Sequence, residues 1–305
     1  MTFLSLAFAL LLEQLRPLRS GNRIYGGFAR YVTRLARNFN AGRYGDGVVS
    51  WLLAVLPLML ATVMISLLLQ RAGGVFALAW NVGVLYLALG FRHFSYFYTD
   101  ILQALQRGDL ARARDLVGEW RGRSAAELDE SEIARVAIEL GLVYSHRHVF
   151  GVIAWFIVLG PAGAIGYRLA ALLATRWGGA RDGDARTFGR FALRAQEIID
   201  WVPARLTALG FAAAGDFMGA IECWRERAAA WPESNRGVVL AAGAGALGVR
   251  LGGVLRREGG IEDRPLLGDG DEAGVDYMQA AVGLIWRALV LWMFLILLAT
   301  VASWF

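Results

Sequence analysis

The sequence predicts an all-α fold: a polytopic membrane helical bundle with amphipathic helices in the cytoplasm or at the membrane interface. The chain is 57% hydrophobic and only 19% charged, with a mean hydropathy of +0.46, which is too apolar for the surface of a soluble protein of this length. Several apolar runs also approach the roughly 20 residues that a helix needs to cross a bilayer. We therefore expect a single membrane domain, residues 1–305.

The N-terminal region combines a short apolar run with a basic arm. Residues 1–12 have the length of a signal-peptide core, but no basic stretch precedes them, and Glu13 and Arg16 follow in place of a cleavage site. We expect this run to stay attached as an interfacial or re-entrant helix. Residues 16–43 contain seven arginines and no acidic residue, which predicts a cytoplasmic arm because cytoplasmic loops are rich in basic residues.

Four segments are predicted to enter the membrane: residues 48–69, 75–91, 149–177 and 284–304. The first two are separated by a short polar break and form a helical hairpin. Gly160 and Pro161 interrupt the third segment, which is therefore kinked or re-entrant. A single crossing there would place residues 178–283 outside, whereas a turn back would leave both polar arms in the cytoplasm. We favour the turn or a deep kink.

The polar arms, residues 92–148 and 178–283, have the periodicity of amphipathic helices. Asp129 and Ser131 indicate a helix start in the first arm. In the second arm, Pro203 is expected to end a helix that begins near Phe188. The sequence then predicts helices at 204–215 and 217–231, a Gly/Ala-rich stretch at 238–255 and a charged loop at 256–276. Small residues allow close helix packing, so we expect the Gly/Ala-rich stretch to be buried.

Three arginines are the main candidates for a binding site. The chain contains no phosphate loop, dinucleotide glycine fingerprint or nucleophile elbow. Arg168, Arg205 and Arg250 instead each stand beside a helix break or a glycine cluster. Guanidinium groups bind phosphate and carboxylate through paired hydrogen bonds, so convergence of the three would form an anion-binding clamp. The alternative for Arg168 is that its long side chain reaches the membrane interface.

Further ligand-binding candidates are Asp200, Asn235, His146 and His148. The two histidines point in different directions on a helix and Arg147 lies between them, so no metal site is expected. Cys223 is the sole cysteine, which excludes an internal disulfide. The net charge of +5 comes from arginines without any lysine, and it does not by itself predict a nucleic-acid partner.

Three ordered blocks resemble a known family. Gly-Pro-Ala-Gly-Ala-Ile-Gly-Tyr-Arg at 160–168, Pro-Ala-Arg-Leu-Thr-Ala at 203–208 and Gly-Ala-Leu-Gly-Val-Arg-Leu-Gly-Gly at 245–253 resemble signature blocks of the CobD/CbiB family. Residues 108–114 and Glu139 fit the same pattern. The resemblance implies an inner-membrane protein related to adenosylcobinamide-phosphate synthase, which joins an aminopropanol unit to a corrinoid carboxylate. A related branch, AmpE, is a membrane signalling modulator linked to β-lactamase induction.

Departures from the synthase pattern bear on the choice between these branches. The polar positions that synthases carry after Glu139, after Arg168 and before Pro203 are mostly apolar or cationic in this chain. Three carboxylates, Glu139, Glu197 and Asp200, are left as catalytic or metal-binding groups. Because the arginines remain, we expect an AmpE-like, non-catalytic sensor or regulatory protein without a cofactor.

The alternative is an adenosylcobinamide-phosphate synthase that uses Mg²⁺ and ATP. In both cases the expected partners are the lipid bilayer and an anionic small molecule with a phosphate or carboxylate: a lipid, a cell-wall-derived compound or a corrinoid. The sequence leaves room for a homo-oligomer. The expected location is the bacterial inner membrane, which the chain crosses several times.

Overall fold

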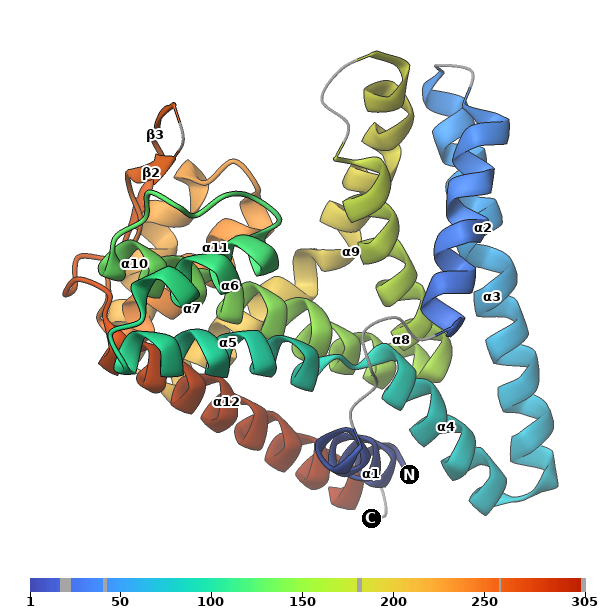
Figure 1. The fold of residues 1–305 in the computed structure, drawn as a ribbon. Helices are drawn as coiled ribbons and strands as arrows, with labels where there is room; N and C mark the ends of the chain where they lie inside the picture. Colours follow the sequence, from blue (N-terminus) through green and yellow to red (C-terminus); the bar gives the residue numbers. More distant parts are fainter. Residues whose placement is uncertain (17–22, 41–42, 180–182, 258, 303–305) are drawn as a thin grey trace. The chain divides into compact units, whose positions relative to one another are not determined.

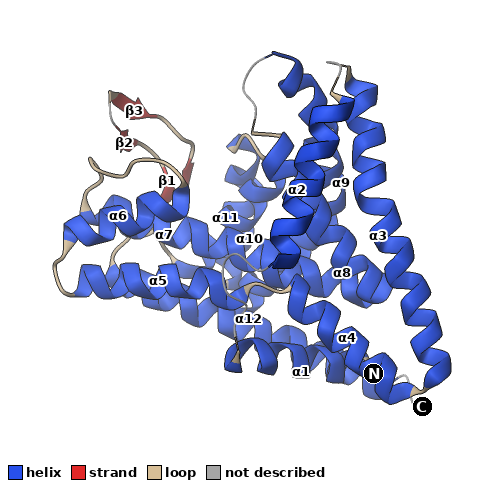
Figure 2. Ribbon diagram, turned by 45° about the vertical axis from the view of Figure 1, so that its right-hand side comes forward, coloured by secondary structure: helices blue, strands red, loops and turns tan. Residues whose placement is uncertain are grey.

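The computed structural model describes residues 1–16, 23–40, 43–179, 183–257 and 259–302. The chain folds into two compact units, each built from two stretches of sequence. Unit 1 comprises Met1–Gly90 and Arg147–Pro203, and unit 2 comprises Phe91–His146 and Ala204–Phe305. Helices dominate both units (Figures 1 and 2), which confirms the predicted all-α membrane fold.

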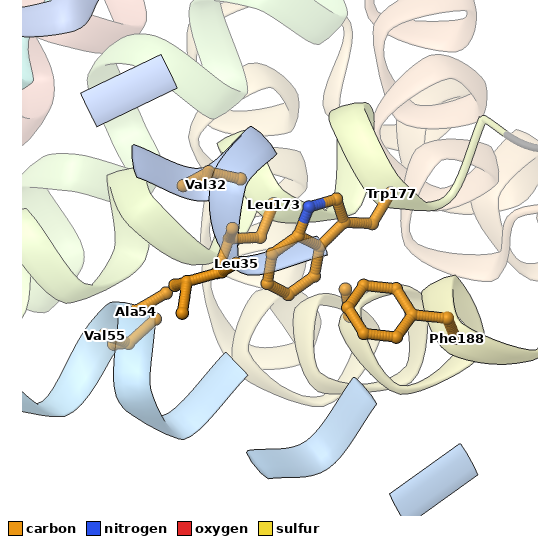
Figure 3. Packing of buried hydrophobic residues seen from close by; sticks show 8 residues of the cluster. Val32, Leu35, Ala54, Val55, Leu173, Trp177 and Phe188 are labelled. Atoms are coloured by element: carbon orange, nitrogen blue, oxygen red, sulfur yellow. The ribbon is translucent and has the colours of Figure 1, made fainter. Parts of the chain in front are cut away.

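Unit 1 consists of helices. They are α1 (Thr2–Leu15), α2 (Arg23–Phe39), α3 (Tyr44–Ala72), α4 (Gly74–Ala88), α8 (Gly151–Trp177) and most of α9 (Gly183–Ala214). Helix α3 contacts α2, α4 and α8, while α1 packs on α4. Figure 3 shows the buried cluster that joins four of these helices, with Val32, Val55, Trp177 and Phe188 among its members.

Three helical stretches are long and apolar enough to cross a membrane: Tyr44–Ala72, Glu130–Trp177 and Val275–Ala302. On α3, Leu60 and Met64 are 66% and 60% exposed, which suits a lipid-facing surface and not a water-facing one. The predicted crossing at 75–91 corresponds to α4, which has 15 residues. At 1.5 Å per residue this helix is about 22 Å long, shorter than the roughly 30 Å hydrocarbon core.

The expected helix end at Pro203 is wrong, because α9 continues through this proline to Ala214. Proline lacks an N–H and leaves the carbonyl four residues earlier without its helical donor. That carbonyl belongs to Ile199, and it accepts a hydrogen bond of 3.1 Å from Trp155 Nε1. The indole replaces the missing donor, so the helix tolerates the proline.

Pro57 in α3 has the same arrangement. The carbonyl that this proline leaves without a helical donor is that of Leu53, and it accepts a hydrogen bond of 3.0 Å from the Tyr31 hydroxyl on α2. In an apolar environment such a replacement matters, since an unpaired carbonyl has no water to bind.

The predicted break near Pro161 is confirmed. Gly160 has φ 62° and ψ −151° inside α8, a non-helical conformation that divides this helix at a kink. Glycine adopts positive φ without the steric cost that a side chain would bring.

Unit 2 combines helices with short strands. Its elements are α5 (Phe91–Gln106), α6 (Leu110–Arg121), α7 (Glu130–Ser145), α10 (Phe217–Arg227), α11 (Ser234–Leu247), α12 (Val275–Ala302), β1 (Leu251–Gly252), β2 (Leu255–Arg257), β3 (Gly260–Glu262), β4 (Leu266–Leu267) and the single turn η2 (Ala228–Ala230). The π-helical turn η1 (His146–Phe150) follows α7. Strands β1 and β4 pair antiparallel, as do β2 and β3, so the region predicted as a loop at 256–276 contains short ladders.

The start of α7 is the predicted one. Asp129 and Glu132 form a capping box, in which each side chain accepts a hydrogen bond of 2.9 Å from the other's backbone N–H. This cap fixes the first turn of α7, the helix that carries Glu139 and Arg135.

The Gly/Ala-rich stretch is largely buried, as predicted, although Gly248, Arg250 and Val254 are exposed. Its helix ends at Leu247. A Cβ on Gly245 would lie 2.1 Å from the Gly219 carbonyl oxygen, so α10 and α11 pack backbone against backbone. Gly248 ends α11 with φ 65°, and Gly252 in β1 has φ 70°. These positive φ values change the direction of the chain within the signature block 245–253, so that its last residues lie against α7.

Candidate functional site

The three arginines of the expected clamp lie in different units: Arg168 belongs to unit 1, while Arg205 and Arg250 belong to unit 2. Convergence of all three therefore stays a prediction. Within unit 2, the structure brings together two other features that the sequence singled out: Glu139 and the signature block 245–253.

Glu139 is the centre of a buried polar network in unit 2. Its side chain is 2% exposed, and its Oε1 accepts a hydrogen bond of 2.8 Å from the Gly252 N–H. Arg264 forms a bidentate pair with it, with distances of 2.7 Å from Nη1 to Oε2 and 3.2 Å from Nη2 to Oε1. The same guanidinium donates to the Gly252 and Gly253 carbonyls and lies 5.9 Å from the centre of the Trp231 ring. Both charges are fully paired.

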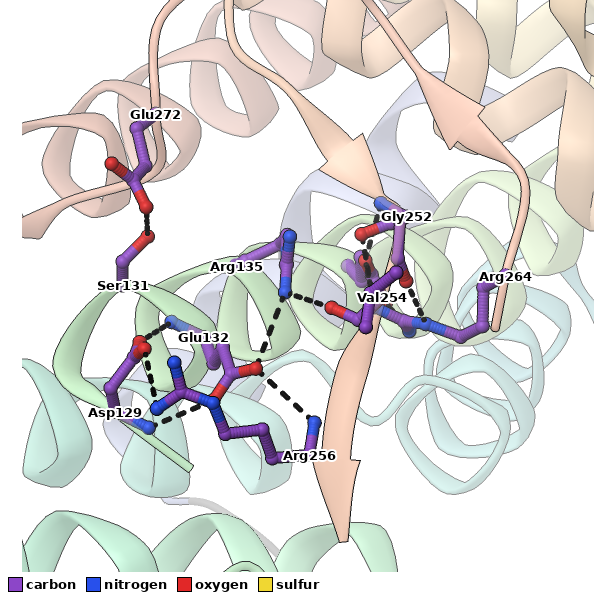
Figure 4. Close-up of polar contacts among 11 residues, drawn as sticks. Asp129, Ser131, Glu132, Arg135, Gly252, Val254, Arg256, Arg264 and Glu272 are labelled. Atoms are coloured by element: carbon purple, nitrogen blue, oxygen red, sulfur yellow. Dashed lines mark hydrogen bonds and ion pairs between the residues drawn. The ribbon is translucent and has the colours of Figure 1, made fainter. Parts of the chain in front are cut away.

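A second arginine, Arg135 of α7, connects this network to β2. Arg135 Nη2 donates to the Val254 carbonyl at 2.6 Å, and it lies 3.9 Å from Glu132 Oε1 (Figure 4). The Glu132 carboxylate also accepts the backbone N–H of Arg256 at 3.2 Å. These contacts hold α7 against the β1–β2 segment.

Arg250, one of the predicted residues, lines a pocket of about 220 Å³. The other polar residues that line it are Arg135, Ser131 and Glu272, and the Ser131 hydroxyl donates to Glu272 Oε1 at 2.8 Å (Figure 4). Arg250 is exposed, and its backbone N–H is fixed by the Asp271 carbonyl at 2.8 Å. Two guanidinium groups, a hydroxyl and a carboxylate at one pocket suit a ligand that carries an anion and a cationic or hydrogen-bonding group.

The remaining predicted residues of unit 2 form local contacts. Arg205 Nη1 donates to Asn235 Oδ1 at 3.2 Å, and burial lowers the pKa of its guanidinium. His146 is buried, with its Nδ1 2.9 Å from the Thr207 hydroxyl oxygen. Arg205 and Asn235 are therefore neighbours, and their hydrogen bond joins α9 to α11.

In unit 1, Asp200 is buried beside Tyr167. The Tyr167 hydroxyl donates to Asp200 Oδ1 at 2.6 Å, and the two side chains are 1% and 4% exposed. A Cβ on Gly151 would lie 2.3 Å from the Tyr167 ring, so this glycine makes room for the tyrosine. Glu197, one turn before Asp200, is instead at the surface and pairs with Arg194 at 3.2 Å.

The histidines have separate surroundings. His148 belongs to unit 1 and packs against Gly90, where an added Cβ would meet the ring nitrogen Nδ1 at 2.6 Å. His146 belongs to unit 2. The change of unit occurs at Arg147, the residue between them.

The candidate carboxylates are not gathered within one unit. Glu139 is in unit 2, and Glu197 and Asp200 are in unit 1. Among the described residues there is no group of three or more His, Cys, Asp or Glu side chains that could hold a metal ion. Arg264 also occupies both oxygens of Glu139, so this carboxylate is not available to a metal ion.

Sequence reasoning missed Arg135, Arg264, Ser131 and Glu272. Arg135 precedes Glu139 by four residues, the spacing of neighbours on one helix face, and this signal was available. Arg264 lies 125 residues after Glu139, and no spacing rule connects residues so far apart.

Comparison with known proteins identifies the family. The family model described as CobD/Cbib protein matches residues 5–285. The chain is 40% identical to cobalamin biosynthesis protein CobD of Stutzerimonas stutzeri (strain A1501), over 97% of each chain. It is 41% identical to the protein of the same name from Chromobacterium violaceum, over 72% of this chain and 70% of that one. No solved structure matches.

These relatives correct the expected function. Proteins that match most of the chain are named for cobalamin biosynthesis, so the expectation of a non-catalytic AmpE-like sensor or signalling modulator is wrong. The loss of some polar positions after Glu139 and Arg168 does not outweigh the similarity of the rest of the chain. The recognised family and the membrane character are confirmed.

Proposed function

Because this chain belongs to the CobD/CbiB family, we propose that it is a membrane enzyme of cobalamin biosynthesis with the activity of an adenosylcobinamide-phosphate synthase. The observation that carries this proposal is the 40% identity with a protein named for that pathway, over 97% of both chains. Similarity of this extent includes both units and all three signature blocks.

The proposed reaction forms an amide between an aminopropanol phosphate and a corrinoid carboxylate. The amine nitrogen attacks the carboxyl carbon after ATP has activated it; the C–N bond forms, the activating group leaves and the nitrogen loses a proton. Such a reaction brings together several anionic groups, which must be held near one another against their mutual repulsion.

The Arg250 pocket has the residues for this task. Arg250 and Arg135 line it and offer guanidinium donors for a phosphate or carboxylate. Glu272, held by Ser131, lines the same pocket and is a candidate to accept the proton that the amine releases. Glu139 and Arg264 hold the glycine-rich block that carries Arg250, and we assign them to positioning because their charges satisfy each other.

The proposed setting is the bacterial inner membrane, with the basic arm 16–43 in the cytoplasm, where ATP is available. The proposed partners are lipid and the two anionic substrates, and Mg²⁺ would accompany ATP.

Complementation tests the proposal. A bacterium that lacks its own adenosylcobinamide-phosphate synthase and needs cobalamin for growth would receive this chain. We expect the wild-type chain to restore growth and Arg250→Ala to fail or to restore it weakly. Arg225→Ala, which changes an exposed arginine elsewhere in unit 2, is the matched control and should behave as wild type. Absence of rescue by a wild-type chain that is present in the membrane would count against the proposed function.

A further inference from the structure

Unit 1 contains an apolar cavity of about 530 Å³ with Arg168 in its wall. Residues of α2, α3, α4 and α8 line it, including Phe28, Leu58, Leu87 and Leu172. Among the described residues that line this cavity, Arg168 is the only charged one. The volume of the cavity lies in the range of ligand pockets, about 300–1,000 Å³.

The other polar groups in this wall already have hydrogen-bond partners. The Tyr31 hydroxyl donates to the Leu53 carbonyl freed by Pro57, and the Thr62 hydroxyl donates to the Leu58 carbonyl at 2.8 Å. Arg168 differs, because its buried Nε has no hydrogen-bond partner within the described part of the chain. A buried donor of a charged group costs free energy until an acceptor reaches it.

The surroundings indicate what supplies the acceptor. Helix α3, one wall of the cavity, is a candidate membrane span whose apolar side chains are largely exposed. Helix α2, another wall, carries the exposed arginines Arg30, Arg34 and Arg37, and no acidic residue occurs anywhere in α2. A basic amphipathic helix of this kind favours anionic lipid.

We propose that this cavity binds one acyl chain of an anionic phospholipid, with the lipid phosphate at the Arg168 guanidinium. The apolar walls solvate the chain, and the phosphate oxygens supply the acceptors that Arg168 lacks. The bound lipid would tie α2 to α3, α4 and α8. This proposal does not depend on the reaction proposed above, because its residues belong to unit 1 and its test detects lipid and not product.

Native mass spectrometry of the full chain, delipidated in detergent, tests the proposal. Phosphatidylglycerol is the probe, and phosphatidylcholine, oleate and inorganic phosphate are comparison ligands. We expect one phosphatidylglycerol to bind at least about tenfold more tightly than phosphatidylcholine, because the choline cation of the zwitterionic lipid offsets the phosphate charge that Arg168 and the basic helix α2 attract. Equal binding of the two phospholipids, or binding of inorganic phosphate as strong as that of phosphatidylglycerol, would overturn the proposal.

Variants locate the site. Arg168→Gln should weaken phosphatidylglycerol binding about tenfold, whereas Arg176→Gln, an exposed arginine eight residues further along α8, should leave it unchanged. Leu169→Trp keeps the guanidinium but fills the cavity, and it should also weaken binding. Thermal unfolding without lipid identifies a variant that fails to fold. If Arg168→Gln fails to fold, lipid binding by Leu169→Trp tests the proposal instead. Retention of wild-type affinity by folded Arg168→Gln or folded Leu169→Trp would contradict the proposal.

Discussion

Arg264 in unit 2 and Arg168 in unit 1 show two uses of a partly buried guanidinium. Arg264 donates to both oxygens of Glu139 and to the Gly252 and Gly253 carbonyls. Arg168 stands in an apolar wall, where its Nε has no partner among the described residues. A saturated arginine stabilises the fold, whereas an unsaturated one beside a cavity indicates a ligand. By this reasoning Arg250, exposed at a pocket, belongs with Arg168 and not with Arg264.

Removal of the partner of Arg264 should give the largest effect on stability. Glu139→Ala leaves a buried guanidinium without its counter-charge, which we expect to cost about 3–5 kcal/mol. Thermal unfolding in detergent, followed by circular dichroism, measures this loss. Glu197→Ala, which removes a surface carboxylate of unit 1, should change stability by less than about 0.5 kcal/mol. If both variants unfolded alike, Glu139 would not have the structural role assigned to it.

Removal of Arg250 should affect activity and not folding. Arg250→Ala deletes one charge-assisted contact to substrate, worth about 1.5–3 kcal/mol, so KM for the anionic substrate should rise roughly 10- to 100-fold. The melting temperature should stay close to that of the wild type because the side chain is exposed. Steady-state kinetics and thermal unfolding of the same preparation measure both effects, and a large loss of stability with unchanged KM would reverse the assignment.

Gly252, the glycine of the signature block whose N–H binds Glu139, should be sensitive to a single added methyl group. Gly252→Ala places a Cβ 2.0 Å from the Pro265 carbonyl oxygen at φ 70°, and we expect a loss of about 2–4 kcal/mol, from the left-handed conformation and the steric clash together. Gly248→Ala is the matched control, with φ 65° and no atom within 4 Å of the added Cβ. It should cost about 1 kcal/mol, the cost of the left-handed conformation alone. Equal losses in the two variants would mean that the β1 segment shifts to relieve the contact.

Cys223 should show the smallest effect, a change in reactivity. Burial raises the pKa of its thiol, and the thiolate is the reactive form. At pH values below the folded-state pKa, each unit of pH should therefore increase the rate of labelling by a thiol reagent about tenfold. Labelling of the folded protein should still accelerate as the pH rises to 9, the ordinary pKa of a cysteine thiol. A plateau below pH 9 would contradict the raised pKa.

The features that the sequence predicts best are local ones. The helix start near Asp129 and the break at Gly160 each depend on residues a few positions apart, and both are present. Pro203 was misread because the group that permits a helix there, the Trp155 indole, is 44 residues from the carbonyl it binds. Arg264, the partner of Glu139, could not be predicted for the same reason: the two residues are far apart in the sequence. The three arginines were found as isolated signals, but which of them have protein partners depends on contacts that only the folded chain shows.

The most direct test of the account is product formation by the purified chain. The protein would be reconstituted in liposomes that contain anionic lipid and supplied with a corrinoid carboxylate, an aminopropanol phosphate and ATP, and the amide product would be measured by mass spectrometry. We predict that the wild-type chain forms the amide and that Arg250→Ala forms it far more slowly at low substrate concentration. A wild-type chain that is folded and inserted but forms no amide would contradict the account.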